Sequence, residues 1–178
     1  MSREPRTLER PDGSRLYYEV GGRGAPLVLI RGLSRSSAYW FDFRDLLEQH
    51  RTVLVLDNRG VGRSSTPRGP WSTEDMADDV ADVLRDSGVE RADVFGISLG
   101  GMVAQHLALR HPHRVKRLML ACTTPGGRGA DRLIHPDNSR RLAARIPGSR
   151  LEWLEGAGHD FPTERPHATR DHVLAFTA

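Results

Sequence analysis

Four short apolar runs recur along this chain, at residues 27–30, 52–56, 92–95 and 115–122, and a stretch with helical character fills each interval between them. Continuous apolar runs of this length are typical of strands that are buried on both faces of a parallel sheet. Parallel strands need a crossover connection, which is usually a right-handed helix packed on the sheet. The pattern therefore predicts an α/β fold, in which helices cover both faces of a mostly parallel, twisted sheet.

The flanking segments extend this pattern towards both ends. Residues 7–9 and 15–20 surround Pro-Asp-Gly-Ser at positions 11–14, which predicts an antiparallel hairpin. Residues 151–154 are predicted to form a further strand, which a right-handed crossover would place beside 115–122. A chain of 178 residues is sufficient for one core, so residues 1–178 are expected to form a single domain. Helices are expected at residues 37–50, 72–87, 98–111, 138–146 and 167–177.

Composition and charge exclude several classes of protein. Charged residues make up 28% of the chain and apolar residues 38%, values that are typical of a globular protein. No apolar run approaches the ~20 residues of a membrane-spanning helix, and the first residues lead into no signal peptide. The net charge is only +3, and the basic residues are interspersed with acidic ones rather than clustered. We therefore expect a cytoplasmic protein that binds neither nucleic acid nor membrane.

The strongest chemical signal is the sequence Gly96-Ile97-Ser98-Leu99-Gly100, which lies between a predicted strand and a predicted helix. A serine in a sharp strand-to-helix turn is held in strained backbone geometry with its hydroxyl above the sheet, and small neighbours are required where the turn is crowded. The N-terminus of the helix offers free N–H groups to a developing negative charge. The alternative is a glycine-rich turn that contains a serine by chance. We favour Ser98 as a catalytic nucleophile.

Several other stretches resemble the α/β-hydrolase fold family, in its esterase, enol-lactonase and haloperoxidase-like branch. Residues 27–33, Leu-Val-Leu-Ile-Arg-Gly-Leu, are similar to the strand and His-Gly loop that supply half of the oxyanion hole, although Arg31 replaces the histidine. Residues 56–64 resemble the Asp-x-Arg-Gly-x-Gly-x-Ser loop of the family. Residues 156–159, Gly-Ala-Gly-His, resemble the turn that bears the catalytic histidine. The resemblance covers nearly the whole chain.

This resemblance implies a set of site residues. Ser98 would be the nucleophile and His159 its base, with His135 as a weaker alternative among the eight histidines. The backbone N–H groups of Leu33 and Leu99 would form the oxyanion hole. No metal ion and no organic cofactor is implied. The side chain at position 31 is expected to be structural or solvated rather than catalytic.

The third member of a Ser-His-Asp triad stands between the serine and the histidine in this family. Asp131 and Asp137 are the acidic residues of that interval that lie in loop-like surroundings. Residues 129–136, Gly-Ala-Asp-Arg-Leu-Ile-His-Pro, resemble the acid loop of the family. We therefore assign Asp131 as the acid and keep Asp137 as the alternative. The acid would accept a hydrogen bond from the imidazole and stabilise the imidazolium.

Two elements of the family have no counterpart in the sequence, namely a helical cap after the nucleophile helix and the core strand that precedes the acid. The resemblance thus implies a minimal, capless α/β-hydrolase fold, and the histidine would emerge one strand position, ~4.8 Å, closer to the serine than usual. We expect a serine esterase that cleaves small carboxylic esters through an acyl-enzyme intermediate. The alternatives are a lactonase or perhydrolase, and a non-catalytic scaffold or binding domain with a misaligned triad.

The absence of a cap also has a consequence for association. Apolar residues at the mouth of the site, with Leu33, Trp40 and Leu99 as candidates, are expected to be partly exposed. Contiguous exposed apolar patches tend to mark interfaces. We therefore expect a homodimer or a larger homo-oligomer, which exchange of the C-terminal strand and helix between two copies could produce.

Overall fold

The computed structural model describes residues 3–124 and 137–178. Its strands form one sheet in the order β1-β2-β4-β3-β5-β6, in which β3, β4, β5 and β6 are parallel and the hairpin β1–β2 is joined antiparallel to β4. This is the mostly parallel sheet that the sequence predicts. The strands are β1 (Glu4–Glu9), β2 (Arg15–Gly22), β3 (Pro26–Ile30), β4 (Thr52–Leu56), β5 (Ala92–Ile97) and β6 (Val115–Ala121).

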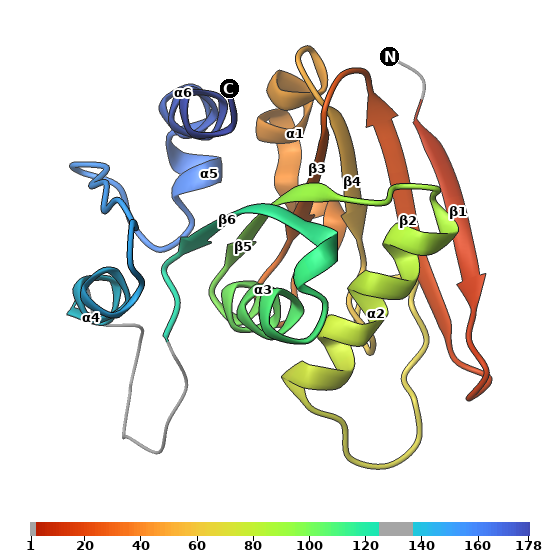
Figure 1. Cartoon of the computed structure of the whole chain (residues 1–178). Coiled ribbons are helices and arrows are strands. Elements are labelled where there is room, and N and C mark those ends of the chain that lie inside the picture. The colour runs from red at the N-terminus through yellow and green to blue at the C-terminus, as the bar shows by residue number, and fades with distance from the viewer. Residues whose placement is uncertain (1–2, 125–136) are drawn as a thin grey trace.

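Helices cover both faces of the sheet, as expected. Helices α2 and α3 lie on one face, and α1 and α6 lie on the other (Figure 1). No helix within the described residues is long and apolar enough to cross a membrane. The helices are η1 (Ser37–Trp40), α1 (Phe41–Glu48), α2 (Thr73–Asp86), α3 (Leu99–Arg110), η2 (Pro112–Arg114), α4 (Asp137–Arg145), α5 (Phe161–Glu164) and α6 (Pro166–Thr177).

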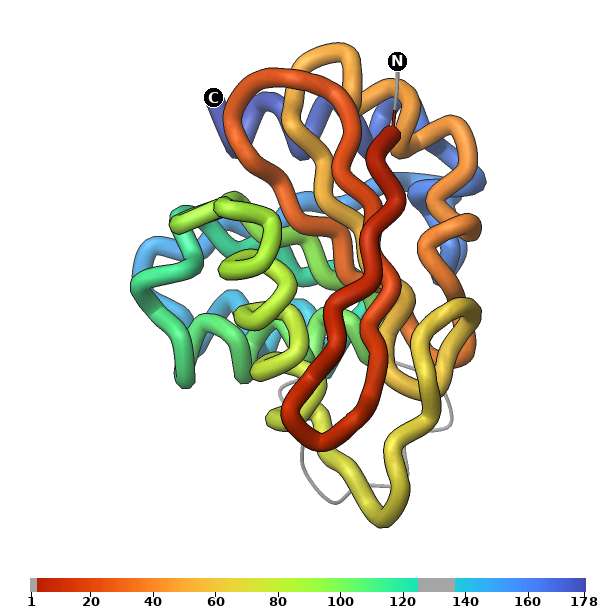
Figure 2. Tube along the Cα trace, turned by 90° about the vertical axis from the view of Figure 1, so that its right-hand side faces the viewer, coloured from red at the N-terminus to blue at the C-terminus, as the bar shows by residue number. Residues whose placement is uncertain are grey.

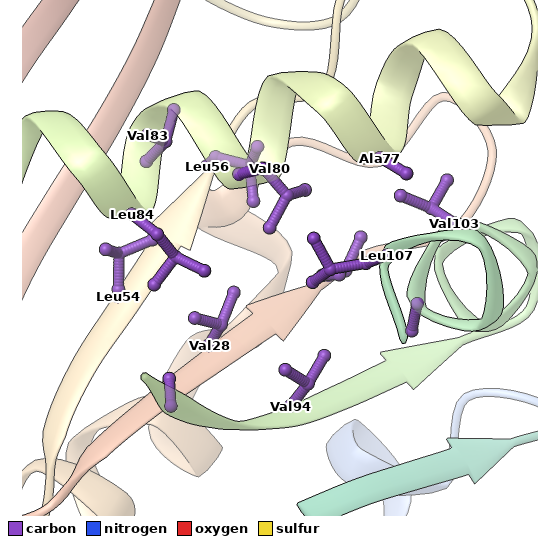
Figure 3. Packing of buried hydrophobic residues seen from close by; sticks show 14 of the residues in the cluster. Val28, Leu54, Leu56, Ala77, Val80, Val83, Leu84, Val94, Val103 and Leu107 are labelled. Atoms are coloured by element: carbon purple, nitrogen blue, oxygen red, sulfur yellow. The ribbon is translucent and has the colours of Figure 1, made fainter. Parts of the chain in front are cut away.

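The central strands bury side chains on both faces because successive residues of a strand point to opposite sides. In β3, Val28 packs towards α2 and α3 (Figure 3), whereas Leu27 and Leu29 pack towards α1 and α6. Each of these three side chains is fully buried. Two apolar cores therefore hold the sheet between its helical layers, and the C-terminal ends of the parallel strands all reach the same edge.

Local signals place several element ends as predicted. Ser72 caps α2 and forms a reciprocal capping box with Asp75. The hairpin turn closes at Gly13, which has a φ of 78°, and Asp12 accepts a hydrogen bond of 2.8 Å from the N–H of Ser14. The hairpin forms the sheet edge that faces the viewer in Figure 2, remote from α4.

The helix predicted at residues 37–50 is interrupted. A 3-10 turn over Ser37–Trp40 directly precedes α1, and Phe41, the first residue of α1, has a φ of 41°. The turn carries Trp40 into the core, where its ring lies 5.7 Å from that of Phe43 and 5.9 Å from that of Phe95. Burial of this large aromatic side chain therefore outweighs the regularity of a continuous helix.

The strand predicted at residues 151–154 does not form, and that prediction was wrong. Among the described strands β6 pairs only with β5, and residues 151–154 run outside the sheet. A half-open cavity of about 680 Å³ lies between β6, α4, α6 and this segment, with Leu118, Leu142 and Trp153 in its walls. A strand requires a neighbour whose backbone it can reach, and the cavity keeps the segment away from β6. Figure 1 shows α4 and the segment beside the sheet rather than within it.

Candidate active site

Ser98 lies in a sharp turn between β5 and α3. Its φ of 57° and ψ of −124° place it in a region that costs a non-glycine residue about 1–3 kcal/mol. Four hydrogen bonds fix its backbone: its N–H donates to the carbonyl of Ala121 at 2.9 Å, and its carbonyl accepts from Thr123 Oγ1 at 2.8 Å and from the N–H groups of Gly101 at 3.0 Å and Met102 at 3.4 Å. The strained conformation is thus enforced by β6 and by the first turn of α3.

Close contacts around this turn leave no room for larger side chains. A Cβ atom on Gly96 would lie 2.4 Å from the carbonyl oxygen of Gly100, and a Cβ on Gly100 would lie 2.1 Å from the carbonyl oxygen of Ile30. Both obstacles are backbone atoms, which cannot move aside as a flexible side chain can. The small neighbours that the motif predicts are therefore required by the packing of α3 on β3 and β5.

The loop after β3 lies against the serine. A Cβ atom on Gly32 would lie 3.0 Å from Ser98 Cβ and 3.4 Å from Ser98 Oγ. The next residue, Leu33, has a side chain that is 72% exposed. Within residues 3–124 and 137–178, the backbone N–H groups of Leu33 and Leu99 have no hydrogen-bond acceptor. Two free N–H donors therefore belong to the segments that adjoin the hydroxyl of Ser98.

Asp57, which directly follows β4, is a buried polar centre of the fold. Its buried carboxylate accepts hydrogen bonds from the N–H of Ser37 at 2.7 Å, the N–H of Arg63 at 3.0 Å and Arg63 Nε at 3.1 Å. Burial raises the pKa of Asp57, but the hydrogen bonds from Arg63 and Ser37 together outweigh it, so the pKa lies below its ordinary value. Asp57 therefore joins the loop after β4 to the start of η1.

Arg31 is a buried structural residue rather than a solvated one. Its side chain is only 2% exposed; Nη1 donates to Asp160 Oδ1 at 2.8 Å, and Nη2 donates to the carbonyl of Tyr39 at 2.6 Å. The guanidinium also lies 4.5 Å from the centre of the Trp40 ring. Burial lowers the pKa of Arg31, and the ion pair with Asp160 only partly offsets this.

His159 occupies the turn between residues 151–154 and α5, and its side chain is exposed. It lies in the wall of the 680 Å³ cavity, which Ser98 does not line. In the part of the chain that the structure describes, no hydrogen bond joins Ser98 to His159. The histidine was expected to follow a strand paired with β6, and the lack of that strand explains why the structure does not join the two side chains.

The acid cannot be located in the same way. Asp131 and His135 lie outside the described residues, and the alternative acid Asp137 is the first residue of α4. The triad of Ser98, His159 and Asp131 stays a prediction. Within the described residues, no group of three or more His, Cys, Asp or Glu side chains could hold a metal ion.

One expectation about the mouth of the site was wrong. Trp40 was expected to be partly exposed, but it is completely buried beneath Arg31. Leu33 is exposed and Leu99 is half-buried, as expected. The 3-10 turn that interrupts the predicted helix directs Trp40 inwards, and this turn has no signal in the apolar pattern of the sequence.

Comparison with known proteins identifies the fold family. The family model described as alpha/beta hydrolase fold matches residues 25–128, which include the β3 loop and the Ser98 turn. The chain belongs to the α/β-hydrolase fold family. The match ends before the turn that carries His159, so the family assignment rests on the part of the chain that contains the candidate nucleophile.

Curated relatives support this assignment. The "Putative carbamate hydrolase RutD" of Azorhizobium caulinodans is 39% identical over 105 residues, an alignment that covers 59% of this α/β hydrolase and 40% of the relative. The "Pimeloyl-[acyl-carrier protein] methyl ester esterase" of Vibrio cholerae is 33% identical over 124 residues, with coverage of 68% and 47%. The chain therefore spans less than half the length of these two relatives.

Solved structures agree on the fold. The enol-lactonase from Burkholderia xenovorans LB400 superimposes with a TM-score of 0.85 at 21% sequence identity, over 97% of this chain and 99% of that one. The structure titled "Est816 as an N-Acyl homoserine lactone degrading enzyme" has a TM-score of 0.87 at 23% identity, over 96% and 100% of the two chains. At these identities the likeness shows the α/β-hydrolase fold alone.

Proposed function

We propose that this α/β hydrolase is a serine hydrolase that cleaves small carboxylic esters. The observation that carries the proposal is the conformation of Ser98, a non-glycine residue held at a positive φ with the Gly32–Leu33 loop against its side chain. Strained residues of this kind cluster at active sites, where the strain is part of the arrangement that presents the reacting group. The two free N–H groups of Leu33 and Leu99 also support the proposal, because such donors can stabilise the oxyanion that forms when the serine attacks an ester.

The reaction would proceed in two steps. In the first, Ser98 Oγ attacks the ester carbonyl carbon, His159 accepts the hydroxyl proton, and the N–H groups of Leu33 and Leu99 stabilise the oxyanion. Collapse of this intermediate breaks the ester C–O bond, and the protonated imidazole gives its proton to the departing alkoxide. In the second step His159 takes a proton from a water molecule, which attacks the acyl carbon. The C–O bond to Ser98 Oγ then breaks, the carboxylic acid leaves, and the imidazolium returns its proton to Ser98 Oγ. Asp131 would orient and stabilise the imidazolium.

The names of the relatives are consistent with this chemistry. A methyl ester esterase and a carbamate hydrolase both act at a carbonyl carbon that bears an oxygen or nitrogen leaving group. We infer a small ester as substrate because the exposed Leu33 beside Ser98 indicates an open site. An open site offers few remote contacts whose binding energy could serve a long acyl chain.

A fluorophosphonate probe tests the proposal directly, because it reacts with an activated serine. We expect rapid labelling of the wild-type protein, hydrolysis of p-nitrophenyl acetate, and loss of both in Ser98→Ala. The matched control is Ser87→Ala, at the end of α2, which should keep the wild-type rate. If Ser98→Ala keeps most of the wild-type activity, Ser98 is not the nucleophile.

A second function is favoured by one observation, namely that no hydrogen bond joins Ser98 to His159 in the described residues. A serine without a base is a weak nucleophile. The chain would then be a hydrolase-like binding domain with a misaligned triad. Absence of labelling in a folded wild-type protein would support this function and contradict the esterase.

A further inference from the structure

Arg31 connects two segments that the proposed reaction must bring together. Its neighbour in sequence is Gly32, which lies against Ser98, and its ion-pair partner Asp160 is the neighbour of His159. One buried side chain therefore bridges the loop on the serine side and the turn that bears the candidate base. The inference that follows rests on the proposed function.

The position of Arg31 is determined by the body of the fold. Its carbonyl accepts a hydrogen bond from Asn58 Nδ2 at 3.1 Å, and its Nη2 donates to the carbonyl of Tyr39. Its guanidinium packs on the face of Trp40, which is itself fully buried among aromatic rings of the core. The loop after β4 thus holds the backbone of Arg31 and η1 holds its guanidinium, and neither set of contacts involves Asp160.

The turn that carries His159 lacks the support that a strand would give it. Residues 151–154 pair with no strand among the described residues, so the sheet does not set the position of the turn. The contacts between its downstream side and the core include the ion pair of Asp160 with Arg31 and the ring of Phe161, which lies 6.4 Å from that of Phe95. Of these, the ion pair is the directional one, because a hydrogen bond constrains both distance and angle.

We propose that Arg31 is a positioning residue, which through Asp160 ties the turn that carries His159 to the loop that lies against Ser98. A guanidinium suits this role because its planar fork donates to Asp160 and Tyr39 from two different nitrogens, whereas a neutral imidazole has a single N–H donor. Arg31 does not touch the reacting atoms and acts only through the turn.

Kinetics of two single variants and their combination test the proposal. Arg31→Met and Asp160→Asn should each lower kcat for p-nitrophenyl acetate by up to about 10²-fold, the effect of a misplacement of about 1 Å, and should change KM less than twofold. The double variant should be no slower than the slower single variant, because both substitutions remove one interaction. The matched control is Arg35→Met, whose guanidinium stacks on Tyr39 at 4.5 Å and forms no hydrogen bond or ion pair with residues 156–160.

Hydrogen exchange gives a readout that does not depend on activity. Amides of residues 156–160 should exchange faster in Arg31→Met and in Asp160→Asn than in the wild-type protein, and at the wild-type rate in Arg35→Met. The double variant carries no unpaired buried charge. Its exchange rates can therefore be measured in place of those of a single variant that does not fold. Unchanged exchange in the folded variants overturns the positioning role. If the fluorophosphonate does not label the wild-type protein, the proposed esterase function is refuted. The hydrogen-exchange result tests only the positioning role and does not depend on that labelling.

Discussion

Replacement of Asp57 by alanine probes the buried polar centre that joins the loop after β4 to the start of η1. The wild-type carboxylate is fully buried and accepts three hydrogen bonds, two from the backbone N–H groups of Ser37 and Arg63 and one from the Arg63 side chain. Alanine removes all three acceptor contacts at once. The N–H of Ser37 would be left buried without an acceptor, since Ser37 is only 2% exposed.

The loss of stability can be worked out from the hydrogen bonds that each former partner of Asp57 loses. An unsatisfied buried donor costs about 1–3 kcal/mol, and two backbone N–H groups are affected. The Arg63 side chain is 45% exposed and can return to water, so its ion pair adds little. We therefore expect Asp57→Ala to lower the free energy of unfolding by about 3 kcal/mol, which corresponds to a fall in Tm of about 6–12 °C for a chain of this size.

Urea and thermal denaturation followed by circular dichroism measure this effect. Asp171→Ala is the matched control, because its carboxylate is exposed on α6 and its ion pair with Arg170 should be worth under about 1 kcal/mol. Because the pKa of Asp57 is lowered on folding, its contribution is fully present above about pH 4 and is lost as the pH falls through the folded-state pKa. A loss below about 1 kcal/mol at pH 7, or one that grows as the pH falls below 4, would refute the reasoning.

Three further predictions concern activity and association. Asp131→Asn should lower kcat by several orders of magnitude, because the analogous change in a serine protease costs ~10⁴, whereas Asp137→Asn should change kcat little. Stopped assays with p-nitrophenyl acetate measure both rates. The opposite result would assign the acid to Asp137. In a panel of p-nitrophenyl esters, the acetate should be preferred with a high KM, and a preference for the decanoate at low KM would contradict an open site. Light scattering at micromolar concentration should show a dimer or larger assembly; a constant mass near 19.8 kDa across a tenfold dilution would disprove association.

Elements that depend on nearby residues could be predicted from the sequence. The strand over residues 52–56 has the predicted boundaries, and the capping box of Ser72 and Asp75 begins α2 where its motif predicts. The turn at Ser98 was also predictable, because the glycines on either side of it are required by contacts within β5, α3 and the neighbouring β3. In the capping box the motif and the constraint lie within three residues of each other, whereas at Ser98 the motif itself marks a turn whose constraints include the distant Ile30.

Features that depend on distant partners could not be predicted in this way. Residues 151–154 have the apolar character of a strand, but a strand also needs a neighbour, and the sequence pattern contains no information on the space beside β6. Arg31 and Asp160 are separated by 129 positions, so no periodicity links them. The inward turn of Trp40 depends on rings from two other elements. The relation of His159 to Ser98 depends on such long-range packing, and the sequence could predict the two residues without predicting their contact.

Among the described strands, β6 has no partner on its outer side, and this affects how the protein behaves at high concentration. Outer backbone groups of an edge strand can template the addition of a strand from another molecule, and natural edges are often protected by charged residues. Lys116 and Arg117 supply such charges at the start of β6, and Arg117 also bonds to the carbonyl of Thr177 at the end of α6. The following residues, Leu118, Met119 and Leu120, carry no charge and are only half-buried. Aggregation on heating should therefore begin at Leu118–Leu120, and a lysine placed at Leu120 would act as a gatekeeper there.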